Sequence, residues 1–386
     1  MDLFIKNETQ KKWLEVLKEK EDTFKSRSAY IDENSIFPVE NFQELVEIGY
    51  PSITLPKSYG GHGLKVYDMV LLQETLASYD ASTALSIGWS LGTIGDLYEN
   101  KSWTDENLEL LANEIVNGAI INRSVSEAQT GSPTRGGRPG TNAIKKNGKW
   151  IINGRKTFTT ASPVLTYFLT SAWIEEKQKV GFFLLHKDLE GLSIDETWNV
   201  IAMRGTGSHD LVLENVEVDE TKLVELPDRS SAKKFNGWML HIPATYLGVA
   251  QAARDYAVHF ANRHQPNSLK TPIAELPNVQ QTLGEIELEL TRARHLIYSV
   301  ADAYDDESRR QHLTNELGVV KHTVTNSAIT IVDKAMRVVG AKSLQLSNPL
   351  QRYYRDVRAG LHNPPMDDMT IKMLAVAALE ADKNNS

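Results

Sequence analysis

Residues Asn147-Gly148-Lys149-Trp150-Ile151-Ile152-Asn153-Gly154 place an apolar run of strand length between two Asn-Gly dipeptides. Asn-Gly is typical of a two-residue β-turn, because both residues tolerate a positive φ. Three more apolar runs of strand length follow, at Tyr167-Phe168-Leu169, Phe182-Phe183-Leu184-Leu185 and Leu211 to Val218. So many strand signals in one block predict a separate, mainly antiparallel β domain over residues 119–228.

The sequence before this block has the apolar spacing of helices. Trp13, Val16 and Leu17 recur at helical intervals in a stretch rich in Lys and Glu. Near the end, Thr104 can cap a helix that Gly118 would stop. We therefore predict an N-terminal helical domain over residues 1–118.

The helical period returns after residue 235 and continues to the end. Three apolar sets predict three long helices, which begin near Leu247, Val279 and Val320, and a last helix is expected near 368–382. Four such helices predict an antiparallel four-helix bundle over residues 229–386. The predicted fold class is thus α+β, in the order helices, sheet, helices.

Composition excludes several classes of function. The 386 residues carry a net charge of −8 and include no cysteine, so disulfides, thiolate metal sites, iron–sulfur clusters and cysteine nucleophiles are ruled out. The acidic balance gives no general attraction to nucleic acid or to anionic membranes. The longest uncharged run, Ala81 to Gly95, is too short to span a bilayer, and Met1 to Lys6 lack a signal-peptide pattern. We expect a cytoplasmic protein without a metal site, because its ten His residues lack ligand spacing.

Two polar segments of the β domain are candidate ligand sites. Ser126-Glu127-Ala128-Gln129-Thr130-Gly131-Ser132-Pro133 is a loop whose amides and hydroxyls could bind a heterocycle, although a solvated turn is the simpler reading. In Lys156-Thr157-Phe158-Thr159-Thr160, an aromatic ring beside hydroxyls could hold a flat cofactor, although an ordinary strand would look the same.

Together with Met203-Arg204-Gly205-Thr206-Gly207-Ser208, these segments resemble the acyl-CoA dehydrogenase family in order and spacing. Leu247 to Ala253 and Arg352 to Asp356 are similar to its C-terminal signatures. The resemblance implies the family's helix–sheet–helix fold, an FAD cofactor and assembly as a dimer of dimers. It also implies an acyl-CoA substrate, with an electron-transfer flavoprotein as electron acceptor.

By this resemblance, the flavin ring would contact Val125, Ser126, Ser132, Phe158 and Thr160. The family's R-x-x-F-G stretch, which reaches the pyrophosphate across the dimer, keeps only its arginine, Arg263. The family's Q-x-x-G-G appears as Arg337-Val338-Val339-Gly340-Ala341, so Arg337 and Gly340 would lie at the outer half of the cofactor. Arg337 could pair with phosphate, mark FMN in place of FAD, or be a solvated helix charge. The resemblance assigns Arg204 a buried structural position.

The family's catalytic base, a Glu that removes the α-proton of the thioester, is missing. Its usual position falls at Pro364 or Pro365 and its alternative position at Trp238. Asp367 and Asp368 lie within one helical turn of the usual position and could replace it. They could equally be helix-capping residues that complement the macrodipole.

The same region also resembles flavin-dependent monooxygenases of this fold, which receive reduced flavin from a partner reductase. In that case His362 would exchange the proton, since its ordinary pKa lies near neutrality; a surface His is the alternative. A non-catalytic member that binds flavin or acyl-CoA is a third possibility. Among these we expect α,β-dehydrogenation, because most chains with this architecture are dehydrogenases.

Overall fold

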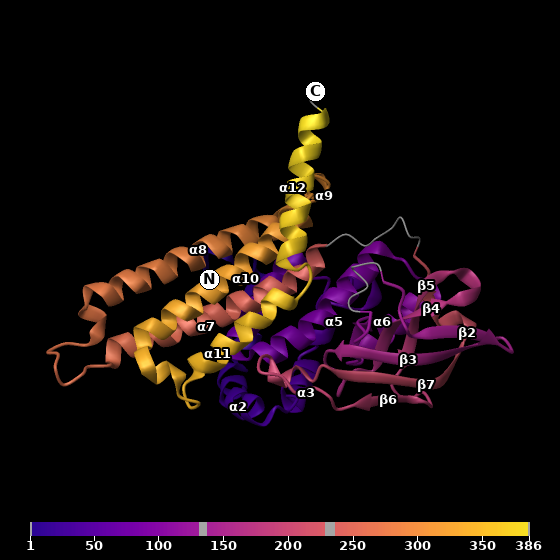
Figure 1. Ribbon diagram of the computed structural model, residues 1–386, viewed down its shortest axis with the longest axis horizontal. Coiled ribbons are helices and arrows are strands. Elements are labelled where there is room, and N and C mark those ends of the chain that lie inside the picture. The colour runs from indigo at the N-terminus through magenta and orange to yellow at the C-terminus, as the bar shows by residue number, and fades with distance from the viewer. Residues whose placement is uncertain (1, 131–136, 228–235, 385–386) are drawn as a thin grey trace.

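The computed structural model describes residues 2–130, 137–227 and 236–384 (Figure 1). The sheet and the C-terminal bundle lie at opposite ends of the long axis, and the N-terminal helices, drawn in indigo and purple, lie between them. The predicted order of helices, sheet and helices is confirmed.

The N-terminal helices form the centre of the molecule. Thr104 caps the last of them, accepting a hydrogen bond of 3.4 Å from the backbone N–H of Asn107, as its sequence predicts. The fourth and fifth helices are almost fully buried, because both the bundle and the sheet pack against this layer. The bounds are α1 (Glu8–Lys18), α2 (Glu21–Asn34), α3 (Val39–Glu47), α4 (Val66–Tyr79), α5 (Ala81–Asn100) and α6 (Asp105–Val116).

Within the described residues, the sheet has eight strands in the order β6-β7-β3-β2-β4-β5-β8, with β1 also paired to β4. Most pairs are antiparallel, as predicted, but β4 pairs in parallel with both β1 and β2. Those two strands lie along the same edge of β4, which a simple meander would not produce. The bounds are β1 (Ile121–Ser124), β2 (Asn142–Lys146), β3 (Lys149–Thr159), β4 (Tyr167–Ile174), β5 (Lys179–His186), β6 (Leu192–Asp195), β7 (His209–Asp219) and β8 (Leu223–Glu225).

The two Asn-Gly dipeptides have different roles. Asn147 and Gly148, with φ of 51° and 77°, form the predicted turn between β2 and β3. The turn predicted at Asn153-Gly154 is wrong: the pair lies inside β3, where its register with β7 shifts in a bulge. A Cβ at Gly154 would lie 2.4 Å from Oγ1 of Thr141, so close packing explains this glycine.

The bundle contains four packed helices, but the fourth is not the one predicted. The helix expected near 368–382 exists, yet it projects away from the body in Figure 1, and α11 packs in the bundle instead. The reason is burial: Leu350 and Val357 of α11 are fully buried, whereas Ile371 and Leu379 of α12 are 55% and 66% exposed. The bounds are α7 (His241–Arg263), α8 (Pro277–Asp305), the short α9 (Glu307–Arg310), α10 (Glu316–Val339), α11 (Pro349–Ala359) and α12 (Asp367–Asn384).

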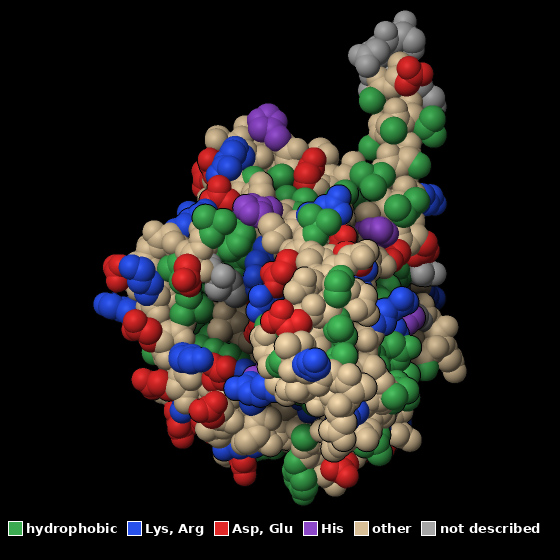
Figure 2. All heavy atoms as spheres, turned by 90° about the vertical axis from the view of Figure 1, so that its left-hand side faces the viewer, with side chains coloured by type: hydrophobic (Ala, Val, Ile, Leu, Met, Phe, Trp, Pro, Cys, Tyr) green, Lys and Arg blue, Asp and Glu red, His purple; other side chains and the backbone are tan. Residues whose placement is uncertain are grey.

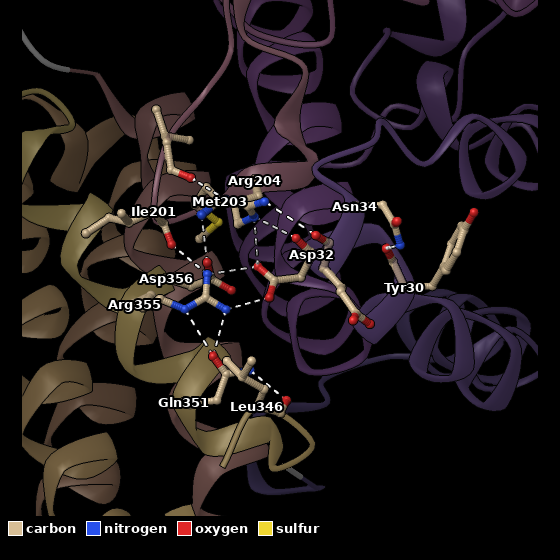
Figure 3. Close-up of polar contacts among 12 residues, drawn as sticks. Tyr30, Asp32, Asn34, Ile201, Met203, Arg204, Leu346, Gln351, Arg355 and Asp356 are labelled. Atoms are coloured by element: carbon tan, nitrogen blue, oxygen red, sulfur yellow. Dashed lines mark hydrogen bonds and ion pairs between the residues drawn. The ribbon is translucent and has the colours of Figure 1, made fainter. Parts of the chain in front are cut away.

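An ion pair and the hydrogen bonds around it join the three parts of the chain (Figure 3). Arg355 of α11 pairs with the carboxylate of Asp32 on α2, with 3.0 Å between Nη1 and Oδ1, and also donates to the carbonyl of Ile201. Arg204, which follows the sheet's β6, donates from Nε to the backbone carbonyl of Asp32 over 2.6 Å. We call this contact of bundle, sheet and N-terminal helices the Asp32–Arg355 clamp.

Beside the clamp, Asp356 is buried to 3% exposure. Its Oδ1 accepts the backbone N–H of Met203 over 2.6 Å, and Met203 has a left-handed φ of 52°. Burial raises the pKa of Asp356 to about 7, although the hydrogen bond from Met203 partly opposes the rise. The folded protein therefore holds a proton on this carboxyl at a pH where the unfolded chain has released it.

Asp356 should make folding stability depend on pH. Because its folded pKa of about 7 lies above the unfolded value of about 3.9, stability falls as pH rises between those values. Asp356→Asn keeps an oxygen for Met203 and cannot ionise. From pH 4 to pH 8 the variant should therefore gain on the order of 3–4 kcal/mol of unfolding free energy relative to wild type. Urea unfolding at both pH values measures this, with the exposed Asp382→Asn as control; parallel profiles for Asp356→Asn and wild type would contradict it.

Candidate active site

The first candidate segment directly follows β1. Val125 and Ser126 are half-buried, and the backbone carbonyl of Ser126 accepts the N–H of Thr157 over 2.8 Å. This bond holds the loop beside the end of β3, so the two candidate segments are neighbours, as the sequence predicts. Ser132 lies outside the described residues.

Phe158, near the end of β3, combines two unusual properties. It is 63% exposed, and its φ is 55°. A left-handed backbone costs a non-glycine residue about 1–2 kcal/mol, and an exposed aromatic ring gains little from the fold. Among the described residues, its ring contacts that of Trp198 edge to face, with 5.8 Å between the ring centroids. A strained backbone that keeps an aromatic ring exposed points to a ligand that covers the ring.

Thr160 lies two residues further on and is nearly buried. Its hydroxyl is 2.9 Å from that of Ser208, which is in turn 2.9 Å from the hydroxyl of Thr206. The carbonyl of Thr160 accepts the side-chain N–H of Asn122. Thr206 donates its proton to the carbonyl of Met203 over 3.0 Å, so Ser208 donates to Thr206 and Thr160 donates to Ser208. The Thr160 oxygen then offers a lone pair to a ring placed over Phe158. Sequence reasoning found Thr160 but missed Ser208, although it quoted the motif that contains it.

Arg263, Arg337 and Gly340 are not brought near Phe158. Arg263 ends α7 and Arg337 lies in the last turn of α10, and both side chains are exposed. Gly340 ends α10 with φ of 71°, and nothing lies within 4 Å of the Cβ position. These residues lie toward the end of the bundle opposite the sheet (Figure 1). Within a single chain, the residues expected at the flavin ring and those expected at the outer half of the cofactor therefore lie far apart.

The expected base position lies between α11 and α12. Pro365 is buried there, and neighbouring Asn363 accepts the hydroxyl of Tyr246 over 2.5 Å. His362 is exposed at the end of the short helix Gly360–His362. Neither residue at the family's usual base position, Pro364 or Pro365, has a carboxylate side chain that could take up a proton.

Asp367 and Asp368 are the first two residues of α12. Asp367 is held by α10: its Oδ1 lies 3.5 Å from Nζ of Lys321, and its Oδ2 accepts Nδ2 of Asn326 over 3.0 Å. Lys321 is fully buried, and burial lowers its pKa while Asp367 opposes the change. Asp368 is exposed. Asp367 thus tethers α12 to the bundle, and both carboxylates lie where they complement the helix dipole.

The alternative base position, Trp238, is also occupied. Its indole N–H donates to Oε2 of Glu99 on α5 over 2.9 Å. Glu99 further accepts the hydroxyl of Tyr304 over 2.7 Å and pairs with Arg310. Sequence reasoning missed Glu99, because no motif relates α5 to the start of α7. A carboxylate does lie beside this position, but three donors already engage it.

The described parts of the chain contain neither a metal-binding cluster nor a helix suited to span a membrane. Within residues 2–130, 137–227 and 236–384, no cluster of three or more His, Asp or Glu side chains is arranged to hold a metal ion. Across the same residues, no helix combines the length and apolar character that crossing a bilayer requires.

Three family models match the chain in sequence order. The model described as "Acyl-CoA dehydrogenase, N-terminal domain" matches residues 7–100, the "middle domain" model matches 123–216 and the "C-terminal domain" model matches 240–363. The matches together include α1 to α5, most of the sheet and the four helices of the bundle.

Individual relatives agree with these matches. YdbM of Bacillus subtilis (strain 168), which carries the name of an acyl-CoA dehydrogenase, is 60% identical over 99% of this chain and 100% of its own length. L-evernosamine nitrososynthase of a Micromonospora species is 28% identical over 92% of this chain and 86% of its own. The structure of a glutaryl-CoA dehydrogenase from Mycobacterium smegmatis in complex with FADH2 has a TM-score of 0.86 at 18% identity, covering 98% of this chain and 96% of that one.

Proposed function

This chain belongs to the acyl-CoA dehydrogenase family, and on that premise we propose that it is a flavoprotein that removes two hydrogens from the α and β carbons of an acyl-CoA thioester. The observation that carries the proposal is Phe158, an exposed ring on a strained backbone beside the Thr160 hydroxyl. A bound flavin would supply the hydride acceptor. The chain supplies the surface that orients it.

The residues around Phe158 fit a flat heterocycle. The ring of Phe158 offers an apolar face, and Thr160 and Ser126 offer hydrogen-bonding groups beside it. FAD is the cofactor we propose, as in the relative whose structure holds FADH2. FMN is the alternative, since the outer half keeps Arg263 and Gly340 but lacks the family's Phe and replaces its Gln with Arg337.

We propose that a second copy of the chain completes this site. Arg263 and Arg337 lie toward the opposite end of the bundle from Phe158, so a cofactor that reaches both sets needs two subunits (Figure 1). The projecting α12 also carries exposed apolar side chains, visible in Figure 2, among them Ile371 and Leu379. A face of this kind is suited to burial between subunits of a dimer of dimers.

For the proton, we propose a carboxylate at the start of α12, either Asp367 or Asp368. Both lie close in sequence to the position where the family places its Glu, although Asp is one methylene shorter. The tether from Lys321 and Asn326 holds Asp367 in one place, which a general base requires. The two electrons that leave the substrate as hydride would pass on to an electron-transfer flavoprotein.

A second candidate function is hydroxylation with oxygen and reduced flavin from a reductase. The prolines at the base position favour it, because such chemistry needs no α-proton base, and one relative is a nitrososynthase. His362 would then exchange the proton, and its exposed position at the α11–α12 junction leaves it accessible.

The first prediction concerns cofactor binding. Phe158→Ala should weaken flavin binding roughly 10- to 100-fold, because stacking of one base on an aromatic side chain contributes about 1–3 kcal/mol. Titration by quenching of flavin fluorescence measures the affinity. The matched control is Tyr30→Ala on α2, an aromatic residue with the same 63% exposure. Equal affinity in both variants would contradict a flavin over Phe158.

The second prediction separates the two chemistries. Anaerobic acyl-CoA should bleach the flavin absorbance, and replacing the base in either Asp367→Asn or Asp368→Asn should slow bleaching about 10²- to 10⁴-fold. Asp382→Asn, on the same helix, is the control. If the double variant bleaches at the wild-type rate, neither Asp is the base. The second function holds instead if two results are found together. No acyl-CoA bleaches the flavin, and oxygen uptake by the reduced protein yields hydroxylated product in wild type but not in His362→Ala.

The third prediction concerns assembly. Light scattering should give wild type the mass of a tetramer, and Ile371→Glu with Leu379→Glu should reduce it, because a charge cannot be buried unpaired at a subunit contact. Leu3→Glu, at a site 76% exposed on the N-terminal segment, should leave the mass unchanged. A wild-type monomer that binds flavin tightly would overturn the shared site.

A further inference from the structure

The β domain contains a buried ion pair between the two segments that face the proposed flavin. Nζ of Lys156, on β3, lies 2.6 Å from Oε1 of Glu127 and 3.1 Å from Oγ of Ser171. Lys156 is fully buried and Glu127 is 7% exposed. Charges this far from water need close partners, and each of these has the other.

Glu127 also binds both ends of its own loop. On the near side it accepts the hydroxyl of Thr130 over 3.1 Å. On the far side it accepts the N–H of Gly140 over 2.6 Å and both the N–H and the hydroxyl of Thr141, over 3.1 Å and 2.7 Å. Burial alone would raise the pKa of Glu127, but the hydrogen bonds from Lys156 and Thr141 outweigh it, so the pKa falls to about 2.

The sequence positions of the pair give it a second role. Glu127 directly follows Ser126, and Lys156 precedes Phe158 by two residues, while 29 residues separate the two charges along the chain. The backbone bond from Thr157 to Ser126 runs beside them. The pair is therefore linked through one backbone residue to Ser126 on one side and through two to Phe158 on the other.

We propose that Glu127 and Lys156 are positioning residues for the flavin: their ion pair sets the separation of Ser126 from Phe158 and Thr160, and through it the reactivity of the bound ring. The inference rests on the proposed function, because it takes the flavin to lie over these residues. Neither charge is exposed enough to touch the ring, so both act through their neighbours. A purely structural pair would hold the sheet together without affecting the cofactor.

The test uses flavin-loaded protein with three variants, Glu127→Gln, Lys156→Met and the double variant. Each single change leaves the partner charge buried and unpaired, whereas the double change removes both charges and should recover part of the loss. We expect the singles to bind flavin about 100-fold more weakly, because an unpaired buried charge costs several kcal/mol and shifts its surroundings to regain a partner. They should also change the visible circular dichroism of the remaining bound flavin. Its reduction potential should shift by about 30 mV, which for two electrons is a tenfold change in relative affinity for oxidised and reduced forms.

The matched control is the exposed pair of Lys145 and Glu220, 2.8 Å apart in the same domain. Lys145→Met and Glu220→Gln should leave affinity, dichroism and potential unchanged. If Glu127→Gln and Lys156→Met lower only the unfolding temperature, while bound flavin keeps its wild-type dichroism and potential, the inference is overturned.

A flavin-free measurement separates this inference from the proposed function. The N–H groups of Gly140 and Thr141 both bond to Glu127. In the single variants their amide exchange should be faster than in wild type, while exchange at the other strands of the sheet stays at the wild-type rate. If wild type takes up no flavin, the proposed function fails, and the positioning role fails with it even where exchange speeds up. If wild type binds flavin but exchange at both amides is unchanged in both single variants, only the positioning role fails.

Discussion

The Asp32–Arg355 clamp is the contact on which the placement of the three parts depends. One continuous apolar core runs through the N-terminal helices, the sheet and the bundle, but apolar packing is not directional. A relative movement of sheet and bundle would separate Phe158 from α11 and α12. The clamp opposes that movement because a guanidinium and a carboxylate bind in a fixed planar geometry. Since both side chains are largely shielded from water, breaking one partner would leave the other charge poorly solvated.

Asp356, the residue after Arg355, adds a constraint of another kind. It bonds to a backbone N–H of the sheet segment, at a residue with left-handed φ, so it fixes the path of the main chain itself. The usual base position and the two candidate Asp residues, Asp367 and Asp368, lie within twelve residues of it along the chain. Geometry at the junction of α11 and α12 is therefore determined by contacts that do not involve substrate.

The sequence predicts the fold well where local signals decide it. Thr104, the Asn147-Gly148 turn and the buried faces of α7, α8 and α10 follow from capping, turn chemistry and periodicity, and all are confirmed. The errors came from long-range packing. Asn153-Gly154 has the composition of a turn, but its glycine is required by the close approach of Thr141, the residue just before β2. The fourth helix of the bundle is α11 and not α12, because the apolar residues of α11 pack against α7 and α10 while those of α12 stay exposed.

The candidate site divides in the same way. Phe158 and Thr160 could be identified because a motif carries them. The contact of Trp238 with Glu99 joins residues 139 positions apart, so no local sequence pattern predicts it. Glu127 and Lys156 were both inside quoted motifs, yet their pairing could not be read, because spacing alone does not say which charges will be buried together.

The clamp also has a consequence for how the chain is made. Asp32 and Arg355 are 323 residues apart, so at a synthesis rate of about 5–20 residues per second Asp32 leaves the ribosome roughly 15–65 s before its partner. The N-terminal helices and the sheet, which share one core, are therefore synthesised well before the clamp can form. A nascent chain stalled before Arg355 would lack both the clamp and the second half of α11, so the bundle is completed at the same late stage as the polar contact that aligns the three parts.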